Sequence, residues 1–427
     1  MTILILGATG FIGQQVLLTL SQAGYPVTGL GRDTRQASAR FPAATWLARD
    51  LRTLRQAADW LPLLDGVTAV INCAGALQDG LRDDLVAVQK DAMLALQQAA
   101  TAYATPPLII QISAPENLAS AGTTFMATKL EADRALAASG IPHVILRPTV
   151  VVGRNAYGGT ALLRAIASFP GVLPLVDAES PMNAVHVHDL AQAVLDAVEG
   201  RIAPGSDLVL AGEPTRSVEQ MARFYRHWLG LADAPVIRLP SVLARPLSLA
   251  ADLAGRLGWR SPLRSTAIRI SGIGVALDEG RRTLTAPDPT LRLATEPAAV
   301  QDLWFARLYL LKPLMILTLS LFWIVSGLVP LLDPVTTSLR FGASMPAGMA
   351  FTVTILTSLL DIALGLAILV QPWAKRAMLG MIAVSLAYLA GGTLIEPTLW
   401  LDPLGPLVKV IPSILLTLAT LAVLEER

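Results

Sequence analysis

Short apolar runs alternate with amphipathic stretches through the first part of the chain. Four of these runs occupy residues 2–6, 67–71, 108–112 and 144–152. Runs of this length, separated by segments long enough for a helix, are typical of buried parallel strands joined by helical crossovers. The pattern therefore predicts an α/β domain built on a parallel sheet.

The last quarter of the chain has a different pattern, with four long apolar stretches at residues 313–332, 341–373, 377–395 and 403–424. A membrane-spanning helix needs about 20 mostly apolar residues, so each stretch is long enough. The alternative is four buried helices of a large soluble core, but such helices are usually shorter and carry a polar face. The pattern favours a compact four-helix transmembrane bundle.

Composition agrees with this division of the chain. The 427 residues are 53% hydrophobic, and only eleven Asp, Glu, Lys or Arg residues follow position 312. A formal net charge of +1 without a basic cluster does not support nucleic-acid binding. Cys73 is the single cysteine, so an intrachain disulfide is impossible. His186 and His188 have no evident third ligand, and we expect no metal site.

The first apolar run breaks into a glycine-rich turn at Gly7, Gly10 and Gly13, and the amphipathic segment 14–23 follows at once. Strand, tight glycine turn and helix in this order can hold a dinucleotide pyrophosphate. The glycines allow a sharp turn and close backbone approach, and the helix N-terminus supplies partial positive charge. The alternative is a glycine turn in another kind of α/β protein.

Several later segments accompany this glycine spacing in a known family. They are Asn72-Cys73-Ala74-Gly75 and the segments 108–114, 144–153 and 184–191. Together with Gly-x-x-Gly-x-x-Gly, they resemble the extended and atypical branches of the short-chain dehydrogenase/reductase superfamily, which are epimerase-like. The resemblance covers roughly residues 1–280 and implies a doubly wound parallel Rossmann sheet with a small α/β substrate domain.

This resemblance also implies a set of cofactor-binding residues. The set comprises Gly7, Thr9, Gly10, Phe11, Ile12, Gly13, Arg32, Asp50, Leu51, Cys73, Ala74, Gly75, Lys129 and Pro148.

The end of the second predicted strand bears on which nicotinamide cofactor is bound. A carboxylate there would bind the ribose 2′-OH of NAD, whereas an arginine accommodates the 2′-phosphate of NADP. Gly31 stands where the family's acidic residue would fall, and Arg32 follows it. The sequence therefore favours NADP(H) over NAD(H). The alternative is that Arg32 is only a solvated loop charge.

The predicted catalytic helix departs from the family pattern. Reductases of this superfamily use a Tyr-x-x-x-Lys pair, in which the tyrosine passes a proton to the substrate oxygen. Here Lys129 is present, but Phe125 stands in place of the tyrosine. Ser113 matches the family's active-site serine. The resemblance thus implies that Lys129 binds the nicotinamide ribose, while the proton donor is missing.

The apolar part of the chain also resembles a known family. Residues 360–365 and 397–409 are similar to the DoxX-like four-helix membrane proteins, and the resemblance covers residues 303–427. It implies a membrane location and, for some relatives, quinone-linked redox chemistry. Two charges interrupt the apolar stretches, Asp361 and Lys409. They predict either an ion pair or polar pocket for a headgroup or quinone, or a structural contact with Lys409 reaching the interface.

The predicted domains are as follows. Residues 1–153 form the dinucleotide-binding domain, with 184–200 returning to it; 154–280 form mainly a substrate-type subdomain; 281–302 form a linker; and 303–427 form the membrane domain.

Charge also predicts how the chain crosses the membrane. We expect the nucleotide domain and the C-terminus in the cytoplasm, with four spans in the inner membrane. No signal-peptide pattern follows Met1, and Lys375 and Arg376 lie in a predicted cytoplasmic loop.

Two functions are compatible with these features. The first is a membrane-bound NADP(H)-dependent oxidoreductase that acts on a hydrophobic or membrane-associated molecule. The second is a non-catalytic NADPH-binding sensor or scaffold subunit of a membrane redox complex, which Phe125 favours. Expected partners are the lipid bilayer, a hydrophobic small molecule or quinone, and a membrane protein.

Overall fold

The computed structural model describes residues 2–75, 79–81, 83–117, 122–266, 275, 282–339, 345–403 and 405–425. The chain forms two compact units. The nucleotide unit comprises Met1–Asp252 and Ser261–Ala306, and the membrane unit comprises Leu253–Arg260 and Arg307–Arg427. The predicted start of the linker at residue 281 and the predicted cytoplasmic end at Arg427 lie outside the described residues.

The nucleotide unit is built on an eight-stranded sheet with the order β14-β11-β6-β5-β4-β1-β2-β3. Every neighbouring pair in it is parallel. The strands are β1 (Thr2–Leu6), β2 (Val27–Gly31), β3 (Thr45–Ala48), β4 (Val67–Asn72), β5 (Leu108–Ile112), β6 (His143–Pro148), β11 (Ser206–Gly212) and β14 (Thr283–Ala286). The predicted doubly wound parallel sheet is confirmed.

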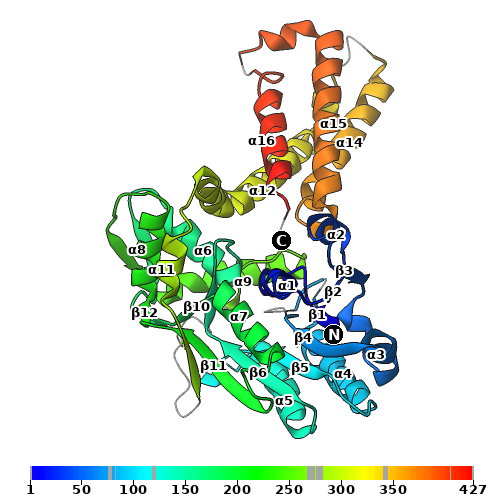
Figure 1. Ribbon diagram of the computed structural model, residues 1–427. Coiled ribbons are helices and arrows are strands. Elements are labelled where there is room, and N and C mark those ends of the chain that lie inside the picture. Colours follow the sequence, from blue (N-terminus) through cyan, green and yellow to red (C-terminus); the bar gives the residue numbers. More distant parts are fainter. Residues whose placement is uncertain are drawn as a thin grey trace. The chain divides into compact units, whose positions relative to one another are not determined.

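Side chains of β1 alternate between two hydrophobic cores, one on each face of the sheet. Ile3 and Ile5 belong to the core that includes side chains of α1 (Phe11–Gln22) and α7 (Val187–Val198). Leu4 and Leu6 belong to the opposite core. That core contains side chains of α3 (Ala57–Leu64), α4 (Ala92–Ala100) and α5 (Thr124–Ala138). Figure 1 shows these helices around the sheet.

A third hydrophobic core is formed mainly by elements that follow β6 in the chain. It includes side chains of α6 (Gly158–Ala167), α8 (Val218–Trp228), β8 (Leu173–Val176) and β13 (Val236–Leu239). Shorter elements complete this unit: α2 (Arg35–Arg40), η1 (Leu51–Thr53), η2 (Val86–Asp91), β7 (Val150–Val152), β9 (Pro181–Met182), β10 (Ala184–His186), β12 (Arg216–Ser217), η4 (Ser241–Leu243) and α11 (Pro289–Ala294). Helix α9 (Ala244–Arg256) begins in the nucleotide unit and ends in the membrane unit.

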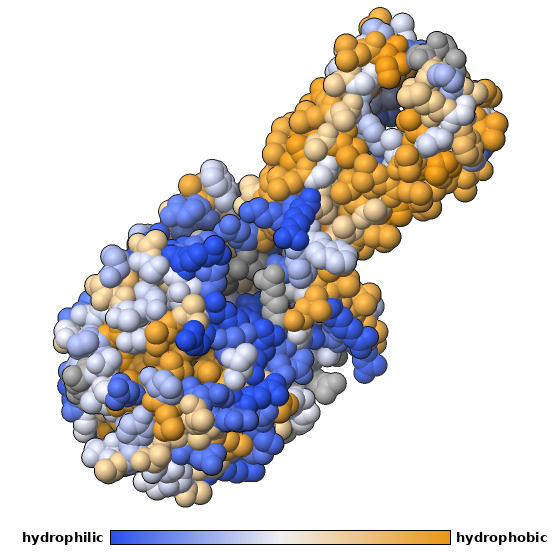
Figure 2. Space-filling model, turned by 90° about the vertical axis from the view of Figure 1, so that its right-hand side faces the viewer, coloured by the Kyte–Doolittle hydropathy of each residue, from blue (hydrophilic) through white to orange (hydrophobic). Residues whose placement is uncertain are grey.

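Among the described residues, three helices are long and apolar enough to cross a bilayer: α12 (Val300–Leu332), α14 (Ala347–Ala367) and α15 (Gln371–Ile395). The short elements α13 (Pro334–Leu339) and η5 (Pro397–Trp400) accompany them. In Figure 2 apolar residues cover most of the visible surface of the membrane unit.

The prediction of a fourth full span at residues 403–424 is wrong. Helix α16 (Val410–Ala422) has only 13 residues, which corresponds to about 20 Å against the roughly 30 Å of a bilayer core. The helix begins late because Pro403 and Pro406 lack amide donors and Gly405 between them has a φ of 57°. Composition alone does not reveal this interruption.

The carboxy-terminal helix nevertheless returns to the end of the membrane unit where the first long helix enters it. Lys312 Nζ donates a hydrogen bond to the Leu424 carbonyl at 2.9 Å. Leu421 and Leu424 pack against a core that includes Ile316. Helix α16 therefore runs back along the unit although it is too short to be a span by itself.

Asp361 does not pair with Lys409, so the predicted ion pair between these charges is wrong, both as part of a ligand site and as a structural pair that fixes helix packing. Its carboxylate accepts hydrogen bonds from the Tyr388 hydroxyl at 2.8 Å and the Ser326 hydroxyl at 3.2 Å. Lys409 is exposed in the turn before α16. Asp361 therefore joins α12, α14 and α15 through neutral hydroxyl partners, because α12 and α14 pack closely enough to bring Ser326 within reach.

Glycines allow this close approach of α12 and α14. A Cβ at Gly365 would lie 2.9 Å from the Ser320 carbonyl oxygen and 2.8 Å from Ile324. The Ser320 hydroxyl donates to the Gly365 carbonyl at 2.7 Å. Small residues at helix crossings are the usual means of close packing in membranes.

We expect Gly365→Leu to separate α12 from α14 and to destabilise the membrane unit by about 1–3 kcal/mol, the usual cost of overpacking. Gly391→Leu on α15 is the matched control, because a Cβ there meets no described atom within 4 Å. The measurement is the thermal unfolding midpoint of the full chain in nonionic detergent. Equal midpoints for the two variants would contradict the packing role of Gly365.

Candidate dinucleotide site

The turn between β1 and α1 can be built only with glycine at two positions. Gly7 has a φ of +70°, and a Cβ on it would lie 2.8 Å from Ala74 Cα. A Cβ on Gly13 would collide with the Gly7 carbonyl oxygen. The turn at Gly7 therefore lies directly against the chain that follows β4, and the first turn of α1 lies directly against Gly7 and Ala8.

The amino-terminal end of α1 is an available anion site. Helix α1 begins at Phe11, and its N-cap, Gly10, provides no side chain to bind the first amides. The Gly10 amide itself donates to the Gly7 carbonyl at 2.9 Å. Uncapped amides and the helix dipole together favour a phosphate at this position.

The predicted residues after β4 lie beside this turn and beside Lys129. The Asn72 side chain accepts from the Ala74 amide at 3.0 Å and donates to Gln111 at 2.9 Å, which holds the segment in place. A Cβ at Gly75 would lie 3.7 Å from Lys129 Nζ. Cys73 is partly buried, and burial raises the pKa of its thiol to about 12. Cys73 is therefore a neutral thiol at physiological pH.

Arg32 follows the end of β2 and is engaged by a carboxylate. Its guanidinium lies 3.1 Å from Asp83, and its side chain is 43% exposed. The position of Gly31 is close to Thr9, whose side-chain atoms would lie 3.1 Å from a Cβ there. A larger side chain at Gly31 would press on the glycine turn. Arg32 is thus the charged side chain that β2 presents at this edge of the sheet.

Asp50 and Leu51 have local structural partners. Asp50 caps η1 by accepting from the Arg52 amide at 3.0 Å, and it forms an ion pair with the Arg52 guanidinium at 2.6 Å. The hydrogen bonds from Arg52 hold the pKa of Asp50 below its ordinary value. Leu51 is buried in the core that contains Leu4 and Leu6. The adenine-binding role of these two residues stays a prediction.

Ser113 belongs to a buried network of charged groups. Its hydroxyl donates to Asp133 at 2.5 Å and accepts from Arg147 at 3.3 Å. Arg147 also donates to Asp133 at 2.9 Å and to Asp207 at 2.7 and 3.0 Å. The side chains of Arg147 and Asp133 are 2% and 1% exposed. Burial raises the pKa of Asp133, although Arg147 opposes the shift.

Sequence reasoning missed the roles of Asp133, Arg147 and Asp207. A signal for the first two was available, because Arg147 interrupts an apolar strand and Asp133 lies one helical turn after Lys129. A buried arginine needs anionic partners. The partner across the sheet, Asp207, is 60 residues away in the chain and has no local signature.

Lys129 and Phe125 lie together on α5. Lys129 Nζ donates to the Ile112 carbonyl at 3.0 Å and lies 5.8 Å from the centre of the Phe125 ring. Burial lowers the pKa of Lys129. Phe125 packs against the cluster formed by Ala114, Met126 and Leu130. The position that holds the family's phenol therefore contributes only an aromatic ring, with no proton to transfer.

Pro148, the last residue of β6, lies next to Arg147 in the sheet. Thr9 and Ile12 lie within or just after the glycine turn. The structure thus gathers the glycine turn, Ala74, Gly75 and Lys129, while Asp50 and Leu51 have the separate local contacts described above.

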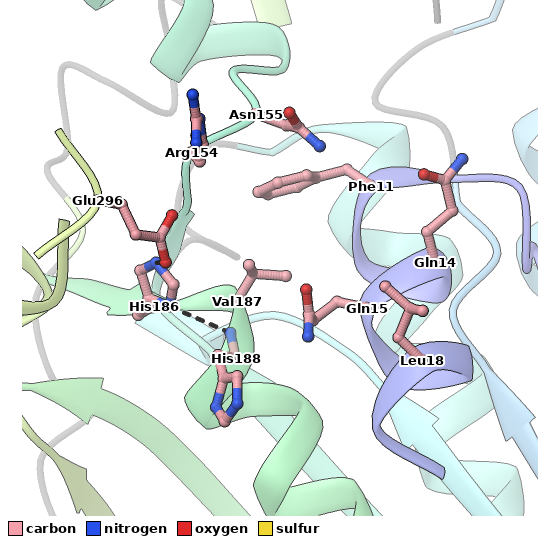
Figure 3. Close-up of a pocket in the computed structure, with 10 residues that line it drawn as sticks. All are labelled: Phe11, Gln14, Gln15, Leu18, Arg154, Asn155, His186, Val187, His188 and Glu296. Atoms are coloured by element: carbon pink, nitrogen blue, oxygen red, sulfur yellow. Dashed lines mark hydrogen bonds and ion pairs between the residues drawn. The ribbon is translucent and has the colours of Figure 1, made fainter. Parts of the chain in front are cut away.

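A small polar pocket of about 130 Å³ lies beside α1 and the start of α7 (Figure 3). Phe11 and Gln14 line one side, and His186 and Glu296 line another. His186 Nδ1 accepts from the His188 amide at 3.3 Å, while its Nε2 lies 3.9 Å from Glu296. Burial, with smaller contributions from Arg292 and His188, lowers the pKa of His186 to about 4.

The sheet and glycine turn define a nucleotide-binding type of α/β domain joined to apolar helices. A comparison with protein families matches residues 3–211 to the NAD dependent epimerase/dehydratase family and residues 320–418 to the DoxX-like family. The chain therefore combines an epimerase-like, short-chain dehydrogenase/reductase-type Rossmann domain with a DoxX-like membrane domain, and both resemblances stated above are confirmed.

Comparison with solved structures gives matches of low sequence identity. The crystal structure of gox2253 is 22% identical, with a TM-score of 0.50, and the match covers 69% of this chain and 96% of that protein. A dTDP-glucose 4,6-dehydratase from Bacillus anthracis in complex with NAD is 14% identical, with a TM-score of 0.48 and coverage of 64% and 96%. The Bordetella bronchiseptica enzyme WbmH in complex with NAD+ is 17% identical, with a TM-score of 0.48 and coverage of 64% and 97%. Curated proteins give no significant match.

The buried, neutral state of His186 predicts a pH dependence of stability. Its folded pKa of about 4 lies below the ordinary value of 6.5, so the unfolded chain binds the proton more readily between these values. The stability that neutral His186 contributes is present above pH 6.5 and is lost as the pH falls towards 4.

We expect His186→Asn to flatten this part of the pH profile, because asparagine keeps an acceptor for the His188 amide but does not titrate. The measurement is the thermal midpoint of both proteins in nonionic detergent from pH 7 to pH 4. Parallel profiles would contradict the assigned pKa shift.

Proposed function

We propose that this chain is a membrane-anchored NADP(H)-binding protein whose nucleotide domain does not perform tyrosine-dependent carbonyl reduction. The observation that carries the proposal is the state of the two family positions at the end of β5 and on α5. Phe125 has no acidic proton, and the Ser113 hydroxyl is committed to Asp133 and Arg147. The glycine turn and Lys129 support nucleotide binding without these groups.

The preference for NADP(H) rests on Arg32. A dianionic 2′-phosphate offers more negative charge than the single carboxylate of Asp83, so it competes for the half-exposed guanidinium. Strand β2 ends at Gly31, the position where an acidic side chain would bind the ribose hydroxyl of NAD, and glycine provides no carboxylate there. NADP(H) therefore supplies the stronger ligand for this edge of the sheet.

Charge and the contacts within the membrane unit support the proposed membrane topology. The Gln371 amide donates to the Leu257 carbonyl, and Lys312 lies over the Trp259 ring, so these residues share one end of the unit. Lys375 and Arg376 begin α15 at that end. Positively charged residues are enriched on the cytoplasmic side of membrane proteins. We therefore propose that the helices lie in the inner membrane, and that this end of the membrane unit, the nucleotide unit and Leu424 face the cytoplasm.

A second candidate function is redox chemistry on a hydrophobic molecule, such as a quinone or lipid carbonyl. The observation that favours it is the Asp361 carboxylate buried among apolar helices with Tyr388 and Ser326. Ionisable groups within membrane helices commonly mark sites that bind polar groups of a ligand. A membrane protein partner is the corresponding expectation for the non-catalytic function.

The cofactor assignment predicts that NADPH binds more tightly than NADH. Arg32→Ala should remove about tenfold or more of the preference, since a charge-assisted hydrogen bond contributes roughly 1.5–3 kcal/mol. Asp83→Asn should strengthen NADPH binding, because it removes the carboxylate that competes for Arg32. Arg35→Ala is the control, since exposed Arg35 forms an ion pair with exposed Asp33. Isothermal titration with both nucleotides measures these affinities, and equal wild-type affinities would refute the assignment.

The absence of a phenol on α5 predicts that the wild-type protein binds NADPH without reducing simple aldehydes or ketones. Phe125→Tyr should introduce turnover, because general acid catalysis is typically worth about 10²–10⁴-fold. Phe125→Leu is the control and should stay inactive. NADPH oxidation is followed with simple aldehydes and ketones, lipid carbonyls and quinones as acceptors.

The outcomes separate the two functions. Binding without oxidation supports the non-catalytic protein, whereas quinone-dependent oxidation that is lost in Asp361→Asn supports the second. Rapid carbonyl reduction by the wild type, unchanged in Phe125→Tyr, would mean that another residue supplies the proton.

A further inference from the structure

Helix α9 and the η4 turn before it present a wide apolar surface that no described residue covers. Leu247, Leu249 and Leu253 are 51%, 69% and 58% exposed. Val242 and Leu243 are equally accessible, at 56% and 58%. At 3.6 residues per turn, Leu249 and Leu253 lie one above the other on α9, and Leu247 lies at the far edge of an arc of about 160° that also contains the exposed Pro246 and Ala250. Isolated exposed leucines are ordinary, but a contiguous apolar arc marks an interaction surface.

The remaining faces of α9 have different characters. Ser248, Ala251 and Gly255 are buried and form a narrow contact face of small side chains. Arg245 and Arg256 are exposed on a strip at the other border of the apolar arc. Three arginines and a single aspartate occur between residues 241 and 260. An apolar arc bordered by basic residues is typical of a helix that lies in the interface of an anionic membrane.

The carboxy-terminal end of α9 is held at the end of two candidate spans. Residues Leu253–Arg260 belong to the membrane unit. Trp259 Nε1 donates to the Leu369 carbonyl at 2.6 Å, and the Leu257 carbonyl accepts from the Gln371 amide at 2.9 Å. Leu369 lies in the connection between α14 and α15, and Gln371 is the first residue of α15. The chain just after α9 is therefore attached at one end of these two candidate spans.

We propose that α9 is an interfacial helix that docks onto the lipid bilayer in which α12, α14 and α15 reside. The leucine arc enters the boundary between headgroups and acyl chains, and Arg245 and Arg256 meet lipid phosphates. Trp259 has the amphipathic ring that is enriched at this depth. The helix thereby gives the nucleotide unit a second membrane attachment, independent of whether that unit turns over its nucleotide.

A bilayer fits these observations better than a protein partner for two reasons. Insertion of the spans brings the bilayer close to the carboxy-terminal end of α9, because Leu257 and Trp259, just after this helix, are hydrogen-bonded to Gln371 and Leu369. The arc also lacks the mixture of aromatic and hydrogen-bonding side chains that characterises the centre of protein interfaces, since its exposed large side chains are aliphatic.

The proposal is tested with the full chain in nanodiscs of phosphatidylcholine and phosphatidylglycerol. An environment-sensitive fluorophore is attached to Leu249→Cys or Leu253→Cys, and doxyl-labelled lipids serve as quenchers. Arg245→Cys on the charged strip and Leu61→Cys on α3 are matched controls, since Leu61 is an exposed leucine of the nucleotide unit. The wild type, with partly buried Cys73 alone, measures background labelling.

We expect blue-shifted emission and strong quenching at positions 249 and 253, weaker quenching at 245 and none at 61. Emission at 249 and 253 that equals that at 61 would show a solvated surface and overturn the proposal. A blue shift without lipid quenching would assign the arc to a protein or a second copy of the chain, and would overturn it as well.

Hydroxyl-radical footprinting of the unsubstituted protein in the same nanodiscs removes any effect of the substitutions. Leu249 and Leu253 should be oxidised less than Leu61. Equal oxidation, corrected for exposure, would also overturn the proposal. Because none of these readouts depends on nucleotide binding or turnover, failure here is distinct from failure of the proposed function.

Discussion

The candidate site depends on the ion pairs that the buried guanidinium of Arg147 forms with Asp133 and Asp207. This guanidinium lies where β5, β6 and β11 meet α5, and it binds carboxylates from α5 and β11 together with the Ser113 hydroxyl. Removing one partner from a buried ion pair commonly costs about 3–5 kcal/mol, because the other charge is left unpaired. The network therefore fixes the position of α5 relative to the sheet, and Lys129 on the same helix is positioned with it.

This constraint also explains why the catalytic positions behave differently from the cofactor positions. Ser113 is bound from two sides, so its hydroxyl is part of the scaffold rather than a group that a substrate meets. Phe125 packs with apolar neighbours one helical turn before Lys129, whereas Asp133 lies one turn after Lys129 on α5. The glycine turn is independent of both, since its geometry is set by backbone contacts with Ala74. The glycine turn and the positions of Ser113 and Phe125 thus depend on different contacts in this fold.

The sequence was sufficient to predict features encoded by local pattern. The parallel sheet followed from its aliphatic runs, and the tight turn followed from Gly7, Gly10 and Gly13. The length of α16 could not be predicted from hydropathy, because Pro403 and Pro406 shorten the helix without changing how apolar the segment is. The partners of Asp361 and Arg147 were equally hidden. Tyr388 and Asp207 carry no local sign of pairing, and tertiary packing alone brings them within reach.

The alternation of side chains along β1 has a consequence for how the chain tolerates length changes. Ile3 and Ile5 pack into the core on one face of the sheet, and Leu4 and Leu6 pack into the core on the other face. Alternate residues of this five-residue strand therefore belong to different cores. Loss of one residue would still leave an aliphatic strand. The turn at Gly7, however, would start half a pleat out of phase, and its amides would aim away from the segment after β4. The length of β1 therefore fixes the direction in which the amides of the glycine turn point, and the composition of the strand does not.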